Sequence, residues 1–288
     1  MIFYAKMILL KKKYLLLFII LLFISGCSTG KFFYDFGDEI VSWQIDNYFD
    51  LTSKQEEWIE ERLRSHLDWH RKQELPIYRD FLIEVQNWSG DGLTMSELDE
   101  GYAWLDQKRV RTLEILLLDT ASFLAGISQE QVNTLEKKMI EDNQEMEKEL
   151  ESPEELLRER RENFWEQMED WFGDFSEDQQ VKINRMHTEW FSGSADPMVS
   201  RLERRRKSQM QFLSQLRSSQ DKVELEKWLR SSVIEWAGEI DSSKQFRILR
   251  NKKRILQVDK LLTPEQRIHA VRELDEWIEI IDGIILDI

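Results

Sequence analysis

Leu51-Thr52-Ser53-Lys54-Gln55 is the helix-start signature that decides how this chain folds. A threonine hydroxyl at the N-cap and a glutamine side chain three residues later satisfy two backbone N–H groups reciprocally. The same order of an apolar residue, a serine or threonine and a glutamine three residues later occurs three more times. These segments are Ile127-Ser128-Gln129-Glu130-Gln131, Phe175-Ser176-Glu177-Asp178-Gln179 and Leu262-Thr263-Pro264-Glu265-Gln266. Four such starts predict a chain built from capped amphipathic helices.

The composition of the chain agrees with an all-α fold. Among 288 residues there are only 11 Gly and 4 Pro, and 33% of the residues are charged. Leucine, glutamate, lysine, arginine and glutamine favour helices, and hardly any strand-like alternation occurs. We expect an all-α protein, a bundle of roughly eight helices.

The helix starts fall into two ordered sets. Caps at Thr52, Thr94 and Ser128 are followed by caps at Ser176, Asp221 and Thr263, at offsets of 124, 127 and 135. This order favours a diverged internal duplication into two four-helix halves, residues 32–151 and 152–288. The alternative is that unrelated helices start alike because capping chemistry is general.

The first 26 residues have the composition of a lipoprotein signal peptide. Lys6 and Lys11–Lys13 precede a short apolar run, and Ile24-Ser25-Gly26-Cys27 follows it. The ending resembles a bacterial lipobox, which implies that Cys27 is lipidated and becomes the mature N-terminus. Residues 27–31 would then form a lipidated linker, and Ser28 indicates the outer membrane by lipoprotein sorting. The alternative is an uncleaved anchor helix with an incidental cysteine.

The charge of the remaining chain restricts its partners. Residues 1–26 contain four lysines and no acidic residue, which leaves 36 of the 40 basic residues against 55 acidic ones, a net charge of −19. Such a surface disfavours nucleic acid and indiscriminate adhesion to anionic lipid. It suits a soluble body held beside a membrane by an anchor.

Two histidines and a glutamate lie on one helical face after the first cap. His66 and His70 are four residues apart and Glu74 is one turn further on. That spacing can chelate a divalent metal. The alternative, which we favour, is a structural polar cluster with imidazoles bonded to Glu74, Arg71 or backbone groups where Pro76 ends or kinks the helix. We expect no cofactor.

Catalytic motifs are lacking in the sequence. There is no Gly-x-Ser-x-Gly elbow, no second cysteine and no glycine-rich phosphate loop, and the many acid pairs are explained by solvated helix faces. We therefore expect a protein that is not an enzyme. The 11 tryptophans are mostly at core spacing, with a few available to hold apolar segments of partners.

One basic run is a candidate anion patch. It could meet lipid headgroups or an acidic partner, or be a solvated face pairing with the surplus glutamates. The run comprises Arg201, Arg204, Arg205, Arg206 and Lys207.

Two resemblances bear on function. The segment Trp69-His70-Arg71-Lys72-Gln73-Glu74-Leu75-Pro76, behind the lipobox and the run Tyr48-Phe49-Asp50-Leu51-Thr52, resembles an uncharacterised family of proteobacterial lipoproteins. That resemblance covers most of the mature chain and implies no known activity. Its motif residues are Trp69, His70, Arg71, Glu74, Leu75 and Pro76.

The capping motif itself resembles the Leu-Thr-x-x-Gln motif of Spy- and CpxP-type periplasmic stress chaperones. Residues 51–55 and 262–266 match it outright, and residues 127–131 and 175–179 match in type. Those chaperones are small helical cradles with two motifs each, so four motifs would fit a fused pair. They are soluble rather than lipidated, and in that respect this chain departs from them.

Together these features predict a non-enzymatic lipoprotein anchored on the periplasmic face of the outer membrane. We expect it to bind envelope proteins or unfolded chains, as a chaperone or adaptor does, and not nucleic acid. The alternatives are an envelope scaffold or assembly factor with one fixed partner, and a His66/His70 metal-binding protein.

Overall fold

The computed structural model describes residues 26–191, 197–238 and 242–286, and these residues confirm the all-α prediction. The described elements are α-helices joined by short turns, with one π-helical turn and no strand among them. In chain order they are α2 (Gly26–Phe49), α3 (Ser53–Trp69), η1 (His70–Glu74), α4 (Leu75–Asp91), α5 (Met95–Ala125), α6 (Gln129–Leu150), α7 (Pro153–Phe172), α8 (Glu177–Phe191), α9 (Pro197–Ser218), α10 (Lys222–Gly238), α11 (Ser242–Asp259) and α12 (Pro264–Leu286).

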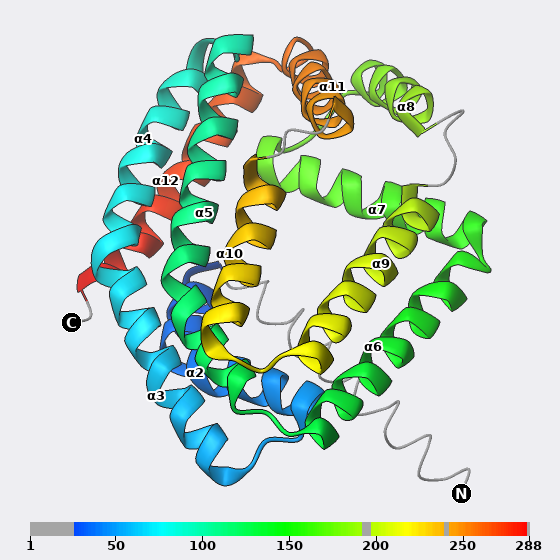
Figure 1. Cartoon of the computed structure of the whole chain (residues 1–288). Helices are drawn as coiled ribbons and strands as arrows, with labels where there is room; N and C mark the ends of the chain where they lie inside the picture. The colour runs from blue at the N-terminus through cyan, green and yellow to red at the C-terminus, as the bar shows by residue number, and fades with distance from the viewer. Residues whose placement is uncertain (1–25, 192–196, 239–241, 287–288) are drawn as a thin grey trace, which may run out of the picture.

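The helices form a ring (Figure 1). On one side α4 packs along α12 and α5 along α10, and on the other side α6 packs along α9. Helix α7 contacts both α6 and α12 and so closes the ring. Helix α2 crosses behind the ring and contacts α3, α6 and α12. The ring therefore brings together helices from the beginning, middle and end of the chain.

The contacts repeat between the two halves of the sequence. If α2, α3, α4, α5 and α6 correspond to α7, α8, α9, α10–α11 and α12, then α4 against α12 is the counterpart of α9 against α6. The contact of α2 with α6 likewise corresponds to that of α7 with α12, and α2 with α12 to α7 with α6. The central helices of each half thus pack against the other half.

The region around Pro76 differs from a simple helix end. Pro76 has no N–H group, and the chain responds with the π-turn η1, in which the Leu75 N–H reaches back to the carbonyl of His70. Helix α4 continues directly from this turn. The wider turn accommodates the proline and keeps α3 and α4 in one helical rod, with Glu74 buried on its inner side.

The apolar core lies around the turns that carry the capping motifs. One cluster of buried residues includes Ile127, Val132 and Leu135 beside Leu216 and Leu225 of the second half. Another includes Phe175, Ile183 and Val258. Ile127 and Phe175, the apolar residues before two of the caps, are buried, and Leu51 and Leu262 before the other two are half-buried. Packing of these residues helps to fix the angle between consecutive helices.

The proposed signal peptide lies almost wholly outside the described residues, which begin at Gly26. Cys27 belongs to the first turn of α2. Among the helices that the structure describes, none combines the length and hydropathy needed to cross a bilayer.

Candidate functional site

The first two glutamine capping motifs meet side by side. Thr52 and Gln55 form a capping box at the start of α3, and Ser128 and Gln131 form one at the start of α6. The amide of Gln55 donates to the carbonyl oxygen of Gln131 at 3.1 Å, and the amide of Gln131 donates back at 2.9 Å. Gln131 also donates to the backbone carbonyl of Asp50 at 3.3 Å. Each glutamine therefore caps its own helix and joins that helix to the other.

The last two motifs meet in the same way. Ser176 and Thr263 accept from the backbone N–H groups of Gln179 and Gln266. The Gln179 amide donates to the Gln266 side chain at 2.8 Å and to the backbone carbonyl of Leu261 at 2.7 Å. Gln266 donates to the carbonyl of Asp174 at 2.8 Å.

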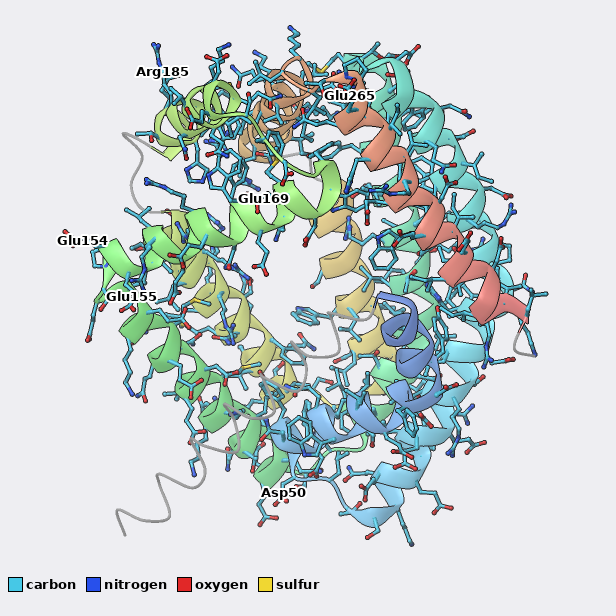
Figure 2. The ribbon with its side chains drawn as sticks, turned by 180° about the vertical axis from the view of Figure 1, so that it is seen from behind. Asp50, Glu154, Glu155, Glu169, Arg185 and Glu265 are labelled. Carbon is cyan, nitrogen blue, oxygen red and sulfur yellow. The ribbon has the colours of Figure 1, made fainter. Side chains whose placement is uncertain are left out.

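The two glutamine pairs mark opposite ends of the ring. Figure 2 shows this through Asp50, which accepts from the first pair, and Glu265, which precedes Gln266 of the second. The backbone before both pairs is also alike, because Asp50 has φ 51° and Gly173 has φ 69°. The two pairs of capping glutamines therefore share one arrangement.

An apolar pocket of about 380 Å³ lies near the first pair. Helices α2, α3 and α5 supply most of its walls, and α6, α9 and α10 contribute one residue each. Arg62, His66, Asp119 and Thr120 are its polar residues apart from the Tyr48 hydroxyl. The apolar lining is Ile45, Phe49, Trp58, Ile59, Leu63, Leu116, Phe123, Leu124, Leu135, Phe212 and Leu229.

A second pocket, of about 850 Å³, lies near the second pair. It is formed by α4, α5, α7, α8, α11 and α12, and its lining includes Trp171, Phe172, Trp190 and Ile255. The guanidinium of Arg254 lies over the Trp190 ring at 5.3 Å and donates to the Trp190 carbonyl at 2.7 Å. This pocket is larger and more polar than the first.

Several lining residues of the two pockets are related by the offsets expected for an internal repeat. Residues that line the first pocket are replaced in the second by residues 123, 127 or 135 positions away, close to the offsets between the caps. In each pocket, two of the six lining helices come from the other half of the chain: α9 and α10 in the first pocket, and α4 and α5 in the second. The counterparts are Ile45 and Met168, Phe49 and Phe172, Leu135 and Ala270, Val85 and Phe212, and Tyr102 and Leu229.

The motif around Pro76 forms a buried ion cluster. Glu74 is fully buried and accepts from Lys108 at 3.2 Å and from Arg111 at 2.5 Å. Both cations come from α5, so the cluster fastens η1 to α5. A buried carboxylate needs such partners, because an unpaired charge in the interior is strongly unfavourable.

The two candidate histidines have separate partners. The His66 imidazole lies 2.9 Å from the carboxylate of Asp119, and His70 Nδ1 lies 2.5 Å from the Tyr34 hydroxyl. Burial lowers the pKa of His70, and burial together with the nearby Tyr78 raises the pKa of Tyr34 to about 12. Both groups are therefore neutral near pH 7, and Nδ1 of the imidazole can accept a hydrogen bond from the Tyr34 hydroxyl.

These partners differ from the ones expected from sequence. The Glu74 carboxylate is bound by Lys108 and Arg111 rather than by an imidazole. Within the described ranges no group of three His, Cys, Asp or Glu side chains is arranged to hold a metal ion. His66, His70 and Glu74 thus bind three separate sets of partners rather than one another. The other motif residues serve packing: Trp69 meets the His70 ring edge-on and Leu75 is buried.

The basic run of α9 pairs partly with α6. Arg205 donates to Asp142 at 3.3 Å and Arg206 donates to Glu147 at 2.5 Å. Asp142 also accepts from the Tyr48 hydroxyl. Two of the five predicted patch residues thus neutralise acids of the neighbouring helix, while Arg201, Arg204 and Lys207 are exposed.

Sequence reasoning missed both pockets. Their lining comes from six helices each, and helix periodicity does not reveal which helices meet. The spacing of the capping glutamines carried a usable signal, because four caps of the same type at similar offsets indicate similar packing around the turns.

Comparison with known proteins identifies a family but no activity. The chain belongs to a family of unknown function (DUF6279), whose match covers residues 47–239. This match includes the motif at residues 69–76 and confirms the expectation of an uncharacterised family. No curated protein and no solved structure matches the chain.

Proposed function

We propose that this protein is a non-enzymatic lipoprotein of the bacterial envelope that binds apolar segments of other envelope proteins or of unfolded chains. The observation that carries the proposal is the pair of repeat-related pockets, each lined by aromatic and aliphatic side chains. Apolar lining of this kind gives affinity without demanding one partner sequence. Two similar pockets in one chain would let an extended client bind at two points, which raises its overall affinity.

The anchor is the second component of the proposal. The basic start, the apolar run and the lipobox ending at Cys27 support export and lipidation, and Ser28 supports retention at the outer membrane. Several acyl chains on Cys27 would hold the protein stably, since a single chain binds only marginally. The acidic body would then face the periplasm without adhering indiscriminately to the anionic lipid around it.

The internal ion pairs also favour binding over chemistry. His66, His70, Glu74 and two of the five cations of the α9 run already have partners within the protein. Their role is to fix the helices that form the pockets. The same rigidity suits the near alternative, an assembly factor with one fixed partner, which would use the same pockets.

A matched pair of substitutions on α5 tests the pocket. Leu116 lines the first pocket, whereas Leu118, two residues on, is 51% exposed outside it. Leu116→Gln should weaken suppression of aggregation of a chemically unfolded client, and Leu118→Gln should leave it unchanged. Circular dichroism and urea unfolding would verify that both variants remain folded.

The outcome of this test distinguishes a chaperone from an assembly factor with one fixed partner. If the wild-type chain suppresses no aggregation, the chaperone reading is wrong. A photoreactive side chain at position 116, crosslinked in intact envelopes, would then tell a fixed partner from many clients. Labelling with radioactive palmitate, lost in Cys27→Ser, tests the anchor independently.

A further inference from the structure

Helix α2 is apolar on two opposite faces. One face carries Ile45, Tyr48 and Phe49, which line the first pocket. The other carries Phe36, Ile40 and Trp43, whose side chains are 44%, 43% and 57% exposed. The spacing of four and three residues places these three side chains in one stripe. A helix that only covered the ring would need apolar residues on its inner face alone.

The position of α2 leaves this stripe partly exposed. The helix lies behind α5 and α10 in Figure 1 and in front of α10 in Figure 2, so it crosses one broad face of the ring. Within residues 34–49 of α2 the buried residues are Gly37, Asp38 and Ser42, and Asp38 and Ser42 lie on the side away from the stripe. Large exposed apolar side chains grouped in this way mark an interaction surface.

The chain supplies a reason for a lipid surface as the occupant. Cys27 lies in the first turn of this same helix, nine residues before Phe36. At 1.5 Å per residue the stripe starts about 14 Å and ends about 24 Å along the helix from Cys27. An anchor in that first turn holds the whole stripe within reach of the headgroup region, provided that the helix lies flat on it.

We propose that the outer face of α2, with Phe36, Ile40 and Trp43, lies in the interface of the membrane to which Cys27 is attached. The inference rests on the proposed lipidation of Cys27 and adds an orientation to it. The ring then lies with one broad face against the bilayer. A tryptophan and a phenylalanine suit the boundary between headgroups and acyl chains, where an amphipathic ring has both environments.

The charged residues near the stripe indicate whether it suits a neutral or an anionic lipid surface. Asp35 and Glu39 are exposed on α2 beside it, with Gln44 and Asn47 further along the helix. Acidic neighbours give no attraction to anionic lipid. We therefore expect partitioning driven by apolar burial, which is insensitive to salt on neutral vesicles and equal or weaker on vesicles that contain anionic lipid.

The test uses Cys27 as a chemical handle. Because it is the only cysteine, the mature chain can be coupled through its thiol to a maleimide lipid in vesicles of phosphatidylcholine and phosphatidylethanolamine. Lipids brominated along the acyl chain should quench part of the tryptophan fluorescence. Trp43→Phe should remove most of that quenching, and Trp171→Phe, an exposed tryptophan of α7, should leave it in place.

A second measurement needs no anchor. The Cys27→Ser mature chain should bind these vesicles weakly in flotation, and Ile40→Glu with Trp43→Glu should lower its partition coefficient by about 10- to 100-fold. Met210→Glu, at a 70% exposed apolar position of α9, is the control for added charge and should change little.

Two results would contradict the proposed contact of α2 with the membrane. Quenching that survives Trp43→Phe would overturn the proposed orientation. Sedimentation showing that the Cys27→Ser chain dimerises until Trp43→Glu is introduced would assign the stripe to a second copy instead. The vesicle experiments do not depend on cellular lipidation, so failure of palmitate labelling would count against the lipoprotein proposal alone.

Discussion

Gln179 and Gln266 hydrogen bond side chain to side chain across 87 residues of sequence, at 2.8 Å, while each caps its own helix. Gln55 and Gln131 form the same arrangement at the other end of the ring. A local helix-start motif thus also acts as a long-range tertiary contact. The residue type matters because an amide can donate and accept at once.

Gln179→Ala should lower the free energy of unfolding by about 2–4 kcal/mol. It removes the acceptor of the Ser176 N–H and the amide donor to the Leu261 carbonyl and to the Gln266 side-chain oxygen. Urea unfolding monitored by circular dichroism measures this loss. Glu97→Ala is the control, because Glu97 occupies the same cap position on α5 and, within the described part of the chain, its side chain hydrogen bonds to Thr94 alone. It should cost only about 1 kcal/mol. Equal losses in both variants would contradict the role of the pair.

Glu74→Gln should destabilise the fold by about 3–5 kcal/mol, because it leaves Lys108 and Arg111 around a site without a countercharge. Differential scanning calorimetry or urea unfolding would show the change. Asp68→Asn breaks the exposed pair of Asp68 with Lys72 and should cost less than about 0.5 kcal/mol. A small effect at Glu74 would mean that the cluster does not fasten η1 to α5.

Stability should fall in mild acid through His70. Burial lowers the pKa of His70 below the ordinary value of 6.5, so the unfolded chain binds the proton at a higher pH than the folded chain. The stabilising difference is complete above about pH 6.5 and is lost progressively as the pH falls toward the lowered pKa. His70→Gln should flatten the slope of unfolding free energy between pH 7.5 and 5.5. An unchanged slope would assign the acid sensitivity elsewhere.

Gly173→Ala should destabilise the second glutamine turn by at least about 1–3 kcal/mol. Gly173 has φ 69° and ψ −155°, a region that is nearly restricted to glycine, and an added Cβ would lie 3.1 Å from the His269 ring. Gly90→Ala in α4 meets nothing within 4 Å and should be neutral or stabilise by up to about 1 kcal/mol. Thermal unfolding of the two variants side by side would reveal the opposite signs, and a tolerated Gly173→Ala would rule out the strain.

Leu229→Phe should raise the stability of the protein and lower its binding of clients. The position lines the first pocket, and its counterpart in the second pocket, Tyr102, is already aromatic. A larger ring that fills the pocket should raise the unfolding free energy by about 0.5–2 kcal/mol. It should also reduce client binding, measured by suppression of aggregation. A variant that is more stable but equally active would place the binding surface outside this pocket.

The sequence by itself determined the helices, because their signals are local. Thr52, Ser128, Ser176 and Thr263 start helices α3, α6, α8 and α12, each with the glutamine three residues on as its second hydrogen-bonding group. These interactions span one turn, so they can be recognised without knowledge of the fold. The order and offsets of the caps likewise indicated a repeat.

Only the tertiary structure decided which helices meet. The pairing of Gln55 with Gln131, the partners of Glu74 on α5, and the two pockets each depend on residues from distant helices. Apolar periodicity shows that a face is buried, but not against which neighbour, because hydrophobic burial is non-directional. The partners of His66 and His70 were missed for this reason. The stripe on α2 was likewise found only when the fold left it exposed.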